Sequence, residues 1–430
     1  MQTTVDRHYD IIVLGGGFTG AAASAAAARL GKKVLLIEES GALGGAAIQA
    51  LVFPFMPYTT AVADDPEHPQ QLTLSRGFFG ELVRDLEKDG QISHGANFNT
   101  EAVKLLLDRK MLEASVDVLF HATLSGVEKS GNRISSLSVI TAAGTLTFTA
   151  ERFIDCTGDA DLSVMAGVPA RLGRDEDQLC QPMTLCFRVG NVDKERFYEA
   201  RPIWSRLYDE WRAAGKIKNP REDILVFNYP IDGVLHFNTT RIVRLNPVDP
   251  FDLSRAEMEA RLQVKELMDF FKENRIPGME KAELLFTAPS IGVRESRMIR
   301  GEYCLTGKDL VACTKFGDAI AAGNYDIDIH NPEGSGTSHY YFPAGTWYTI
   351  PYRALVPKEE DCENLLTAGR CISVDHEAQA SIRIIPICTT TGEAAGVGAA
   401  VSLSEGVSVQ KVNVGTVQKI LLENGAFLGI

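Results

Sequence analysis

The sequence has no apolar run long enough to cross a membrane, no closely spaced pair of cysteines and no excess of basic residues. A membrane helix needs about 20 consecutive apolar residues, and the polar stretch from Met1 to Tyr9 lacks the apolar centre of a secretory signal. A formal net charge of −13 does not attract nucleic acid or an anionic membrane. We therefore expect a cytoplasmic protein with neither nucleic acid nor a membrane as partner.

The eight cysteines are scattered along the chain, at positions 156, 180, 186, 304, 313, 362, 371 and 388. Disulfide frameworks, zinc sites and iron–sulfur sites all need clustered thiols. We therefore expect reduced and mostly buried cysteines. Histidines near Asp326 and Asp328 raise the question of a metal site, but their spacing matches no standard ligand pattern, and we predict no metal.

The length and composition indicate a globular protein of two or three domains. The chain has 430 residues, of which 45% are hydrophobic and 23% charged, as in ordinary soluble domains of about 100 to 200 residues each. Such a chain can bury a sizeable cavity between its domains.

The N-terminal segment predicts a strand, a helix and a second strand. Residues 9–15 are apolar and rich in β-branched side chains, which is typical of a strand buried on both faces. Residues 19–30 are mostly alanine, so a helix there can pack close to a sheet, and Gly31 ends it. Residues 33–38 give the second strand and complete a βαβ unit of about 30 residues.

The turn between this strand and helix has the spacing of a dinucleotide-binding motif. Gly15 permits a tight turn, Gly17 lets the backbone approach a pyrophosphate, and Gly20 allows close contact between helix and strand. The N-terminus of the helix offers free N–H groups to the same anion. Glu38, at the end of the next strand, is in the position of the carboxylate that binds the ribose hydroxyls.

Further glycines favour FAD over NAD as the dinucleotide. Gly44 and Gly45 form a second glycine turn that would let the backbone wrap the far side of an extended cofactor. Gly158 and Gly369 each follow a predicted buried strand, as expected if one sheet covers a long buried cofactor. No second complete motif with a following acidic residue is present, so we expect no dedicated NAD(P)H domain.

After the N-terminal unit, segments with the pattern of buried strands and helices alternate with a more polar region. From about Gly167 it becomes a mixed α+β region with charged helices. Residues 316–351 are rich in Gly, Pro, Tyr, Asn and His, and we expect an irregular, substrate-facing loop there. The predicted elements are helices over 75–88, 100–114, 192–215, 254–274 and 388–403, strands over 116–120, 153–158 and 364–369, and a β-meander over 122–150.

Together these motifs resemble the bacterial FAD-dependent oxidoreductase family, which is related to glutathione reductase and to the fumarate reductase flavoproteins. The resemblance includes residues 154–160, 292–297, 350–353, 364–373 and 391–396 as well as the N-terminal motif. It implies an α/β fold with a Rossmann-type FAD-binding domain over 1–166 and 355–430 that contains a β-meander. A mixed α+β substrate domain would then occupy 167–354.

The resemblance also implies which residues contact FAD. They are the glycine motifs, the acidic strand end and their neighbours, with the backbone near residue 118 on the adenine side: Gly15, Gly17, Phe18, Thr19, Gly20, Glu38, Glu39, Gly44, Gly45, Ala46, Val118, Thr157, Gly158, Asp159, Gly369 and Arg370. The last long helix, starting near Pro386, should direct its N-terminal N–H groups at the N1–C2=O edge of the flavin.

Four residues are candidates for catalysis. His376 follows the last FAD motif and can move a proton near neutral pH, although a structural hydrogen bond to a carboxylate would also explain it. Arg294 and Arg383 could bind a substrate carboxylate, or could form salt bridges to Glu302, Glu377 or Glu393. His339, in the loop-rich region, could also reach the substrate.

These residues predict an FAD-dependent dehydrogenase or reductase. It would transfer a hydride between flavin N5 and a small polar organic substrate at the domain interface, with an external electron donor or acceptor regenerating the flavin. A monooxygenase or oxidase that uses oxygen is one alternative, and an electron-transfer flavoprotein subunit is another. A homo-oligomer remains open.

Overall fold

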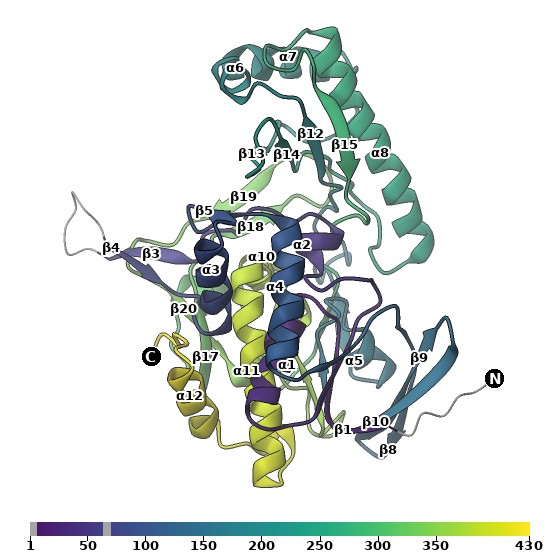
Figure 1. Ribbon diagram of the computed structural model, residues 1–430, viewed down its shortest axis with the longest axis vertical. Helices are drawn as coiled ribbons and strands as arrows, with labels where there is room; N and C mark the ends of the chain where they lie inside the picture. Colours follow the sequence, from purple (N-terminus) through teal and green to yellow (C-terminus); the bar gives the residue numbers. More distant parts are fainter. Residues whose placement is uncertain (1–6, 63–69) are drawn as a thin grey trace.

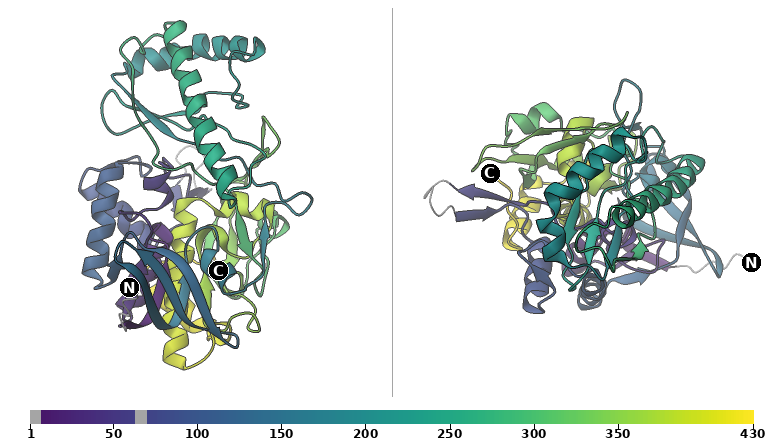
Figure 2. Two further views of the ribbon diagram at one scale, coloured as in Figure 1. Left: turned by 90° about the vertical axis from the view of Figure 1, so that its right-hand side faces the viewer. Right: turned by 90° about the horizontal axis from the view of Figure 1, so that it is seen from above.

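A computed structural model describes residues 7–62 and 70–430 of the chain. A central sheet with the strand order β7-β2-β1-β10-β9-β8 forms the larger part of the protein, and β21 pairs with β10 beside this path. A second lobe with its own sheet and three helices stands on top of this body (Figure 1). The same two lobes are distinct when the molecule is turned by 90° (Figure 2).

The parallel half of the central sheet is built from short apolar strands. These are β1 (Arg7–Leu14), β2 (Val34–Ile37), β7 (Asp117–Leu119), β10 (Gly144–Asp155) and β21 (Leu365–Thr367). Strand β1 lies between β2 and the second half of β10. Side chains alternate between two hydrophobic clusters, with Ile11 and Val13 in one and Ile12 and Leu14 in the other. Both faces of the sheet are therefore covered, as the apolar strand sequences predict.

The β-meander expected over 122–150 is confirmed. Strands β8 (Thr123–Ser130) and β9 (Arg133–Thr141) pair antiparallel, and β9 pairs with the first half of β10. Because β10 then continues alongside β1, a single strand belongs to both the meander and the parallel sheet. Helix α5 (Asp161–Met165) and the meander contribute to the cluster on the same face of the sheet.

Two helices from opposite ends of the chain cover the other face. Helix α1 (Phe18–Arg29) and helix α11 (Ile385–Glu405) cross in close contact in front of the sheet (Figure 1). Glycines on α11 permit this close approach of the two helices. A Cβ atom on Gly392 would lie 2.2 Å from the Thr19 carbonyl oxygen, and one on Gly396 would lie 2.2 Å from the Ala23 carbonyl oxygen. The small-residue pattern of both helices is thus a packing requirement.

The upper lobe is a mixed α+β unit. Its antiparallel sheet has the order β13-β14-β12-β15, from β12 (Phe187–Gly190), β13 (Val226–Asn228), β14 (Leu235–Phe237) and β15 (Glu283–Thr287). Helices α6 (Lys194–Glu199), α7 (Arg201–Ala213) and α8 (Pro250–Glu273) cover one face of this sheet. Their buried side chains form a separate hydrophobic cluster around stacked aromatic rings such as Phe187 and Phe237.

The expectation of an irregular loop over 316–351 is wrong. This region contains the strand pairs β17 (Ala319–Gly323) with β20 (Tyr348–Pro351) and β18 (Ile327–His330) with β19 (Thr337–Tyr340). The strands are only four or five residues long, so their pairing depends on packing against neighbouring helices more than on their own sequence pattern.

The remaining elements connect or cover these units. They are α2 (Ala46–Gln49), β3 (Thr59–Val62), β4 (Gln70–Thr73), α3 (Phe78–Lys88), β5 (Ile92–Ser93), β6 (Asn97–Phe98), α4 (Thr100–Glu113), β11 (Ala170–Leu172), β16 (Arg297–Ile299), α9 (Gly307–Val311), α10 (His376–Ile382) and α12 (Val414–Glu423). Among the described residues, no single helix is long and apolar enough to cross a membrane, although α10 and α11 pass that test as a pair bent by 96°.

Candidate functional site

The first glycine turn is compressed between β1, α1 and the end of β10. Gly15 has a φ of +98°, and a Cβ atom there would lie 2.4 Å from the carbonyl oxygen of Cys156. A Cβ on Gly20 would lie 1.9 Å from the carbonyl oxygen of Gly15. Only glycine fits at either position. No acidic side chain lies in the first turn of α1, so the N-terminus of this helix can receive an anion.

The second glycine turn lies directly against the first. The N–H group of Gly44 donates a hydrogen bond of 2.8 Å to the carbonyl oxygen of Gly16. A Cβ on Gly45 would lie 2.8 Å from the Cα of Gly17. We call these two turns, residues 15–20 and 44–45, the glycine cradle. Their contact leaves bare backbone on both sides of one site, which an extended pyrophosphate can approach.

Glu38, which directly follows β2, is hydrogen-bonded to the glycine cradle. Its carboxylate is 6% exposed and accepts hydrogen bonds from the Gly16 N–H group at 2.6 Å and from the Ser40 hydroxyl at 2.6 Å. Val118 lies on β7, the neighbour of β2, and Ala46 begins α2 immediately after the cradle. Desolvation and the negative charge of Glu38 raise the pKa of Glu39.

The other predicted FAD positions come from the ends of β10 and β21. The Arg370 guanidinium donates a 2.7 Å hydrogen bond to the Asp159 carboxylate, and a Cβ on Gly158 would lie 2.9 Å from the same guanidinium. Gly369 approaches α1, since a Cβ there would lie 2.8 Å from the Thr19 hydroxyl. The carboxyl ends of three parallel strands thus meet the cradle, which is where α/β sheets bind their ligands.

The structure therefore brings the predicted cofactor residues to one edge of the sheet. Thr157 follows β10, where its hydroxyl donates to Asp155 at 2.7 Å, and Phe18 is buried against Phe55 at the start of α1. Glycines whose Cβ atoms would clash, a helix N-terminus and a buried carboxylate together fit the pyrophosphate and ribose of a dinucleotide.

His376 forms a pair with a buried carboxylate that the sequence did not reveal. Its Nδ1 atom lies 2.7 Å from Oε1 of Glu295, which is fully buried. The second oxygen of Glu295 accepts a 2.9 Å hydrogen bond from the Gln181 N–H group, and the Gln181 amide donates to Gln379 at 2.9 Å. These partners are 81 to 198 residues apart in sequence, so no local pattern could have indicated them.

Arg294 and Arg383 lie near this network, and the salt bridges considered for them are absent from the described residues. Arg294 donates to the Pro182 carbonyl at 2.7 Å, to the Thr184 hydroxyl and to the Asn238 side chain at 3.2 Å. Arg383 contacts Asp328, at 3.4 Å from Oδ2. The alternative of ion pairs with Glu302, Glu377 or Glu393 is therefore wrong. Burial and the positive charge of Arg383 lower the pKa of Arg294.

His339 lies on β19, where its Nδ1 atom is 2.5 Å from Asp326. With Asp328 these residues form a group whose ligand atoms lie within 4.8 Å of one another. Arg383 and His330 also contact Asp328, at 3.4 and 3.2 Å. The guanidinium balances this carboxylate, and the pKa of Asp328 is held well below its usual range, whereas burial lowers the pKa of His330. The absence of a metal stays a prediction.

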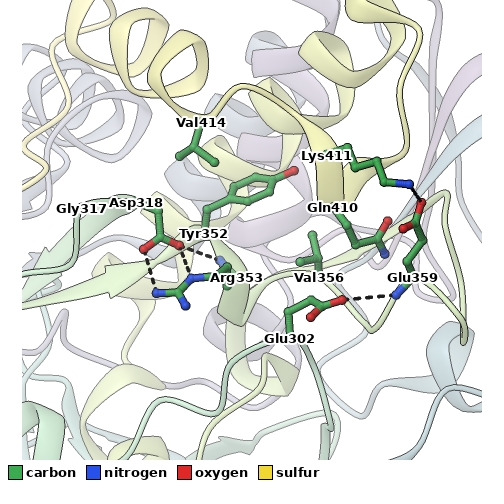
Figure 3. Close-up of a pocket in the computed structure, with 10 residues that line it drawn as sticks. All are labelled: Glu302, Gly317, Asp318, Tyr352, Arg353, Val356, Glu359, Gln410, Lys411 and Val414. Atoms are coloured by element: carbon green, nitrogen blue, oxygen red, sulfur yellow. Dashed lines mark hydrogen bonds and ion pairs between the residues drawn. The ribbon is translucent and has the colours of Figure 1, made fainter.

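An open groove of about 590 Å³ lies on another part of the surface (Figure 3). Two ion pairs line it, Asp318 with Arg353 at 2.9 Å and Glu359 with Lys411 at 2.6 Å. Glu302 accepts a 3.3 Å hydrogen bond from the Glu359 N–H group. None of the predicted site residues lines it. The groove therefore offers no free group for the chemistry expected of this protein.

A family model described as FAD dependent oxidoreductase matches residues 10–421. The chain belongs to this family. Its cofactor is FAD, as the cradle and the position of Glu38 had indicated. The family match also confirms the Rossmann-type α/β fold and the oxidoreductase class that the sequence motifs predicted.

Solved structures of similar fold include several flavoproteins. A geranylgeranyl bacteriochlorophyll reductase-like protein from Thermoplasma acidophilum is 13% identical, over 98% of this chain and 84% of that chain, with a TM-score of 0.46. The flavin-dependent brominase Bmp2 is 12% identical, over 97% and 84%, with a TM-score of 0.49. The p-nitrophenol 4-monooxygenase of Pseudomonas putida DLL-E4 is 10% identical, over 98% and 84%, with a TM-score of 0.45. No curated protein matches the chain significantly in sequence.

Proposed function

We propose that this FAD-dependent oxidoreductase transfers a hydride between flavin N5 and a small polar organic substrate, and that an external electron donor or acceptor regenerates the flavin. When bound, FAD supplies the hydride chemistry. The chain supplies cofactor binding, a group that moves one proton, and cations that orient the substrate. The site lies where residues 167–354, the proposed substrate domain, meet the glycine cradle.

The observation that carries this proposal is the pair of His376 and Glu295. Because a carboxylate can only accept a hydrogen bond, the 2.7 Å contact fixes a proton on Nδ1 of His376 and leaves Nε2 as the basic nitrogen. The buried carboxylate also holds the imidazole ring in one orientation. Such a pair can accept a proton from a substrate hydroxyl or return it, as hydride transfer to or from carbon requires.

Arg294 and Arg383 supply positive charge beside this pair. The main chain of Arg294 accepts a 2.6 Å hydrogen bond from Gln379 on α10, the helix that begins at His376. Its guanidinium has only neutral acceptors among the described residues. We assign Arg294 to the polar group at the reacting end of the substrate, because an oxyanion there would provide the counter-charge that Arg294 lacks. Arg383, which faces Asp328, is the second cation beside it.

The test compares two variants, His376→Asn and Glu295→Gln, with the exposed control His8→Asn. Each protein is loaded with FAD and mixed without oxygen with a panel of small hydroxy acids, amines and enoates, while the absorption of oxidised flavin is followed. We expect His376→Asn to slow flavin reduction by the active compound about 10² to 10⁴-fold. Glu295→Gln should slow it less, because the amide oxygen can still accept from Nδ1 of His376. The control should behave as the wild type.

Two results would contradict the proposal. If His376→Asn reduced the flavin at the wild-type rate, the histidine would not move the proton. If no compound reduced the flavin without oxygen, and product formed only with oxygen and a separate reductant, the protein would instead be a monooxygenase.

A further inference from the structure

The upper sheet carries an arginine and a histidine side by side on the face opposite its hydrophobic core. Arg188 on β12 and His236 on β14 are direct partners in the antiparallel register. Their neighbours in sequence, Phe187 and Phe237, point into the core under the helices. Arg188 is 3% exposed and His236 is fully buried.

Most of the polar atoms of these two side chains have no partner among the described residues. Arg188 donates one hydrogen bond, from Nη1 to the Thr100 hydroxyl at 3.1 Å, while its Nε and Nη2 atoms make none. Both ring nitrogens of His236 are also unpartnered. Among the described residues, no carboxylate accepts a hydrogen bond from the Arg188 guanidinium. A buried cation without a counter-ion is unfavourable, and it usually marks a group that a ligand completes.

Aromatic rings form the walls around this pair. The Arg188 guanidinium lies 3.7 Å from the centre of the Tyr229 ring and 5.5 Å from that of Phe286. The His236 ring is 5.1 Å from Phe53, and Phe227 lies beyond it at 6.2 Å. Phe286 is 45% exposed on the edge strand β15, so a single side chain separates Arg188 from solvent on that side. We call Arg188, His236 and the four aromatic rings around them the aromatic recess.

A helix N-terminus adds to the positive charge of the aromatic recess. Thr100, which accepts the one hydrogen bond of Arg188, is the first residue of the 14-residue helix α4. The positive end of the helix dipole therefore lies beside the guanidinium. The first turn of the same helix also carries Glu101, and the Asn99 side chain caps it. Burial and the charge of Arg188 lower the pKa of His236 to about 3, so this ring is a neutral donor and acceptor.

The chain segments that carry the aromatic recess also carry residues of the proposed active site. Phe53 follows the second glycine turn of the cradle by eight residues. Thr184 and Asn238, which bind Arg294, lie on the chain segments next to β12 and β14. Four residues of extended chain separate Thr184 from Arg188, a span of about 13 Å. A molecule that contacts Arg188 and the residue bound to Arg294 would have to be about this long.

We propose that Arg188 and His236 bind the carboxylate of an aromatic organic acid, and that this acid is the substrate of the oxidoreductase. The planar guanidinium suits a carboxylate, the histidine N–H group adds a second donor, and the aromatic walls suit a flat apolar body. The other end of the same molecule lies at Arg294 and His376. This assignment rests on the proposed function for the identity of the ligand as substrate.

The test uses benzoate as the probe, with neutral benzamide as its matched control. Thermal unfolding of the FAD-loaded wild type is compared with that of Arg188→Met, which keeps the length of the side chain and removes its charge. Arg206→Met, at an exposed position of α7, is the control variant. We expect benzoate but not benzamide to raise the Tm of the wild type and of Arg206→Met, and Arg188→Met to bind benzoate at least about tenfold more weakly.

The same variant distinguishes a ligand site from a structural arginine. If Arg188 has no counter-ion until an anion binds, Arg188→Met should have a higher Tm than the wild type in the absence of ligand. The substitution replaces an unpaired buried cation by an apolar side chain. A lower Tm without ligand, or a benzoate effect that Arg188→Met retains, would overturn the proposal. Failure here leaves the flavin reduction test of His376 unaffected, so the two proposals can fail separately.

Discussion

Replacing Gly392 by alanine should weaken both the fold and FAD binding, because it inserts a methyl group between α1 and α11. The new Cβ atom would lie 2.2 Å from the Thr19 carbonyl oxygen and 2.8 Å from its carbon. Since these are backbone atoms, no side chain can rotate away. The two helices would have to separate by about 1.2 Å to reach ordinary contact at 3.4 Å.

Two effects of opposite sign determine the size of this change. Overpacking a close-packed interior costs about 1–3 kcal/mol, and a rigid backbone contact belongs at the upper end. Alanine is favoured over glycine inside a helix by about 1 kcal/mol. We therefore expect a net destabilisation of about 2 kcal/mol. Because Thr19 also touches the position of Gly369 in the cofactor site, FAD should bind about tenfold more weakly, a difference of ~1.4 kcal/mol.

The assay is thermal unfolding with and without FAD, together with the Kd of FAD from quenching of its fluorescence. Gly80→Ala on α3 is the matched control, because its new Cβ would meet only the end of the flexible Arg84 side chain, at 3.3 Å. That variant should gain about 1 kcal/mol from helix propensity. A Gly392→Ala protein with unchanged Tm and Kd, beside a stabilised control, would refute the packing argument.

Three further results are expected. Acid denaturation and filtration of the yellow protein should release FAD, identified by mass, whereas a colourless protein that cannot be reconstituted would contradict the cofactor assignment. Glu38→Ala should weaken FAD binding at least about tenfold, because the ribose loses a charged acceptor, while Glu101→Ala at an exposed position should not. Burial raises the pKa of Glu393 to about 7 from its ordinary 4.5, so the folded state holds this proton more tightly and loses stability as the pH rises between these values. Glu393→Gln should thus be more stable than the wild type at about pH 8, by up to ~3 kcal/mol. Below about pH 5 the two proteins should be nearly equal in stability. A difference in Tm that does not change with pH would contradict this.

The parts of the fold that depend on local sequence were predictable. The strand, glycine turn and helix at residues 9–30 follow from apolar runs, a fixed glycine spacing and an alanine-rich segment, and the structure has β1 and α1 within one or two residues of them. Glu38 could be assigned because its distance along the chain from the glycine turn is fixed by the length of a βαβ unit.

The polar partners inside the site could not be predicted in this way. His376 and Glu295 come from segments 81 residues apart, and Arg188 was not singled out because a lone arginine in a strand pattern is ordinarily solvent-exposed. Arg188 is buried because β14 lies beside it and the start of α4 lies across from it. Neither neighbour can be deduced from the local sequence. The short strands β18 and β19 were missed for a related reason, since they are stabilised by their contacts with α10 and with each other.

The contact between α1 and α11 determines when the protein can first hold its cofactor during synthesis. Gly369, Thr391 and the helix that closes against α1 come from the last seventy residues of the chain. At about 5–20 residues per second, a ribosome takes roughly 20 to 80 s to reach the end of α11 after it has made the glycine turn. Throughout that time the surface of α1 that α11 covers is without that partner, so FAD can be bound stably only after residues 385–405 have been made.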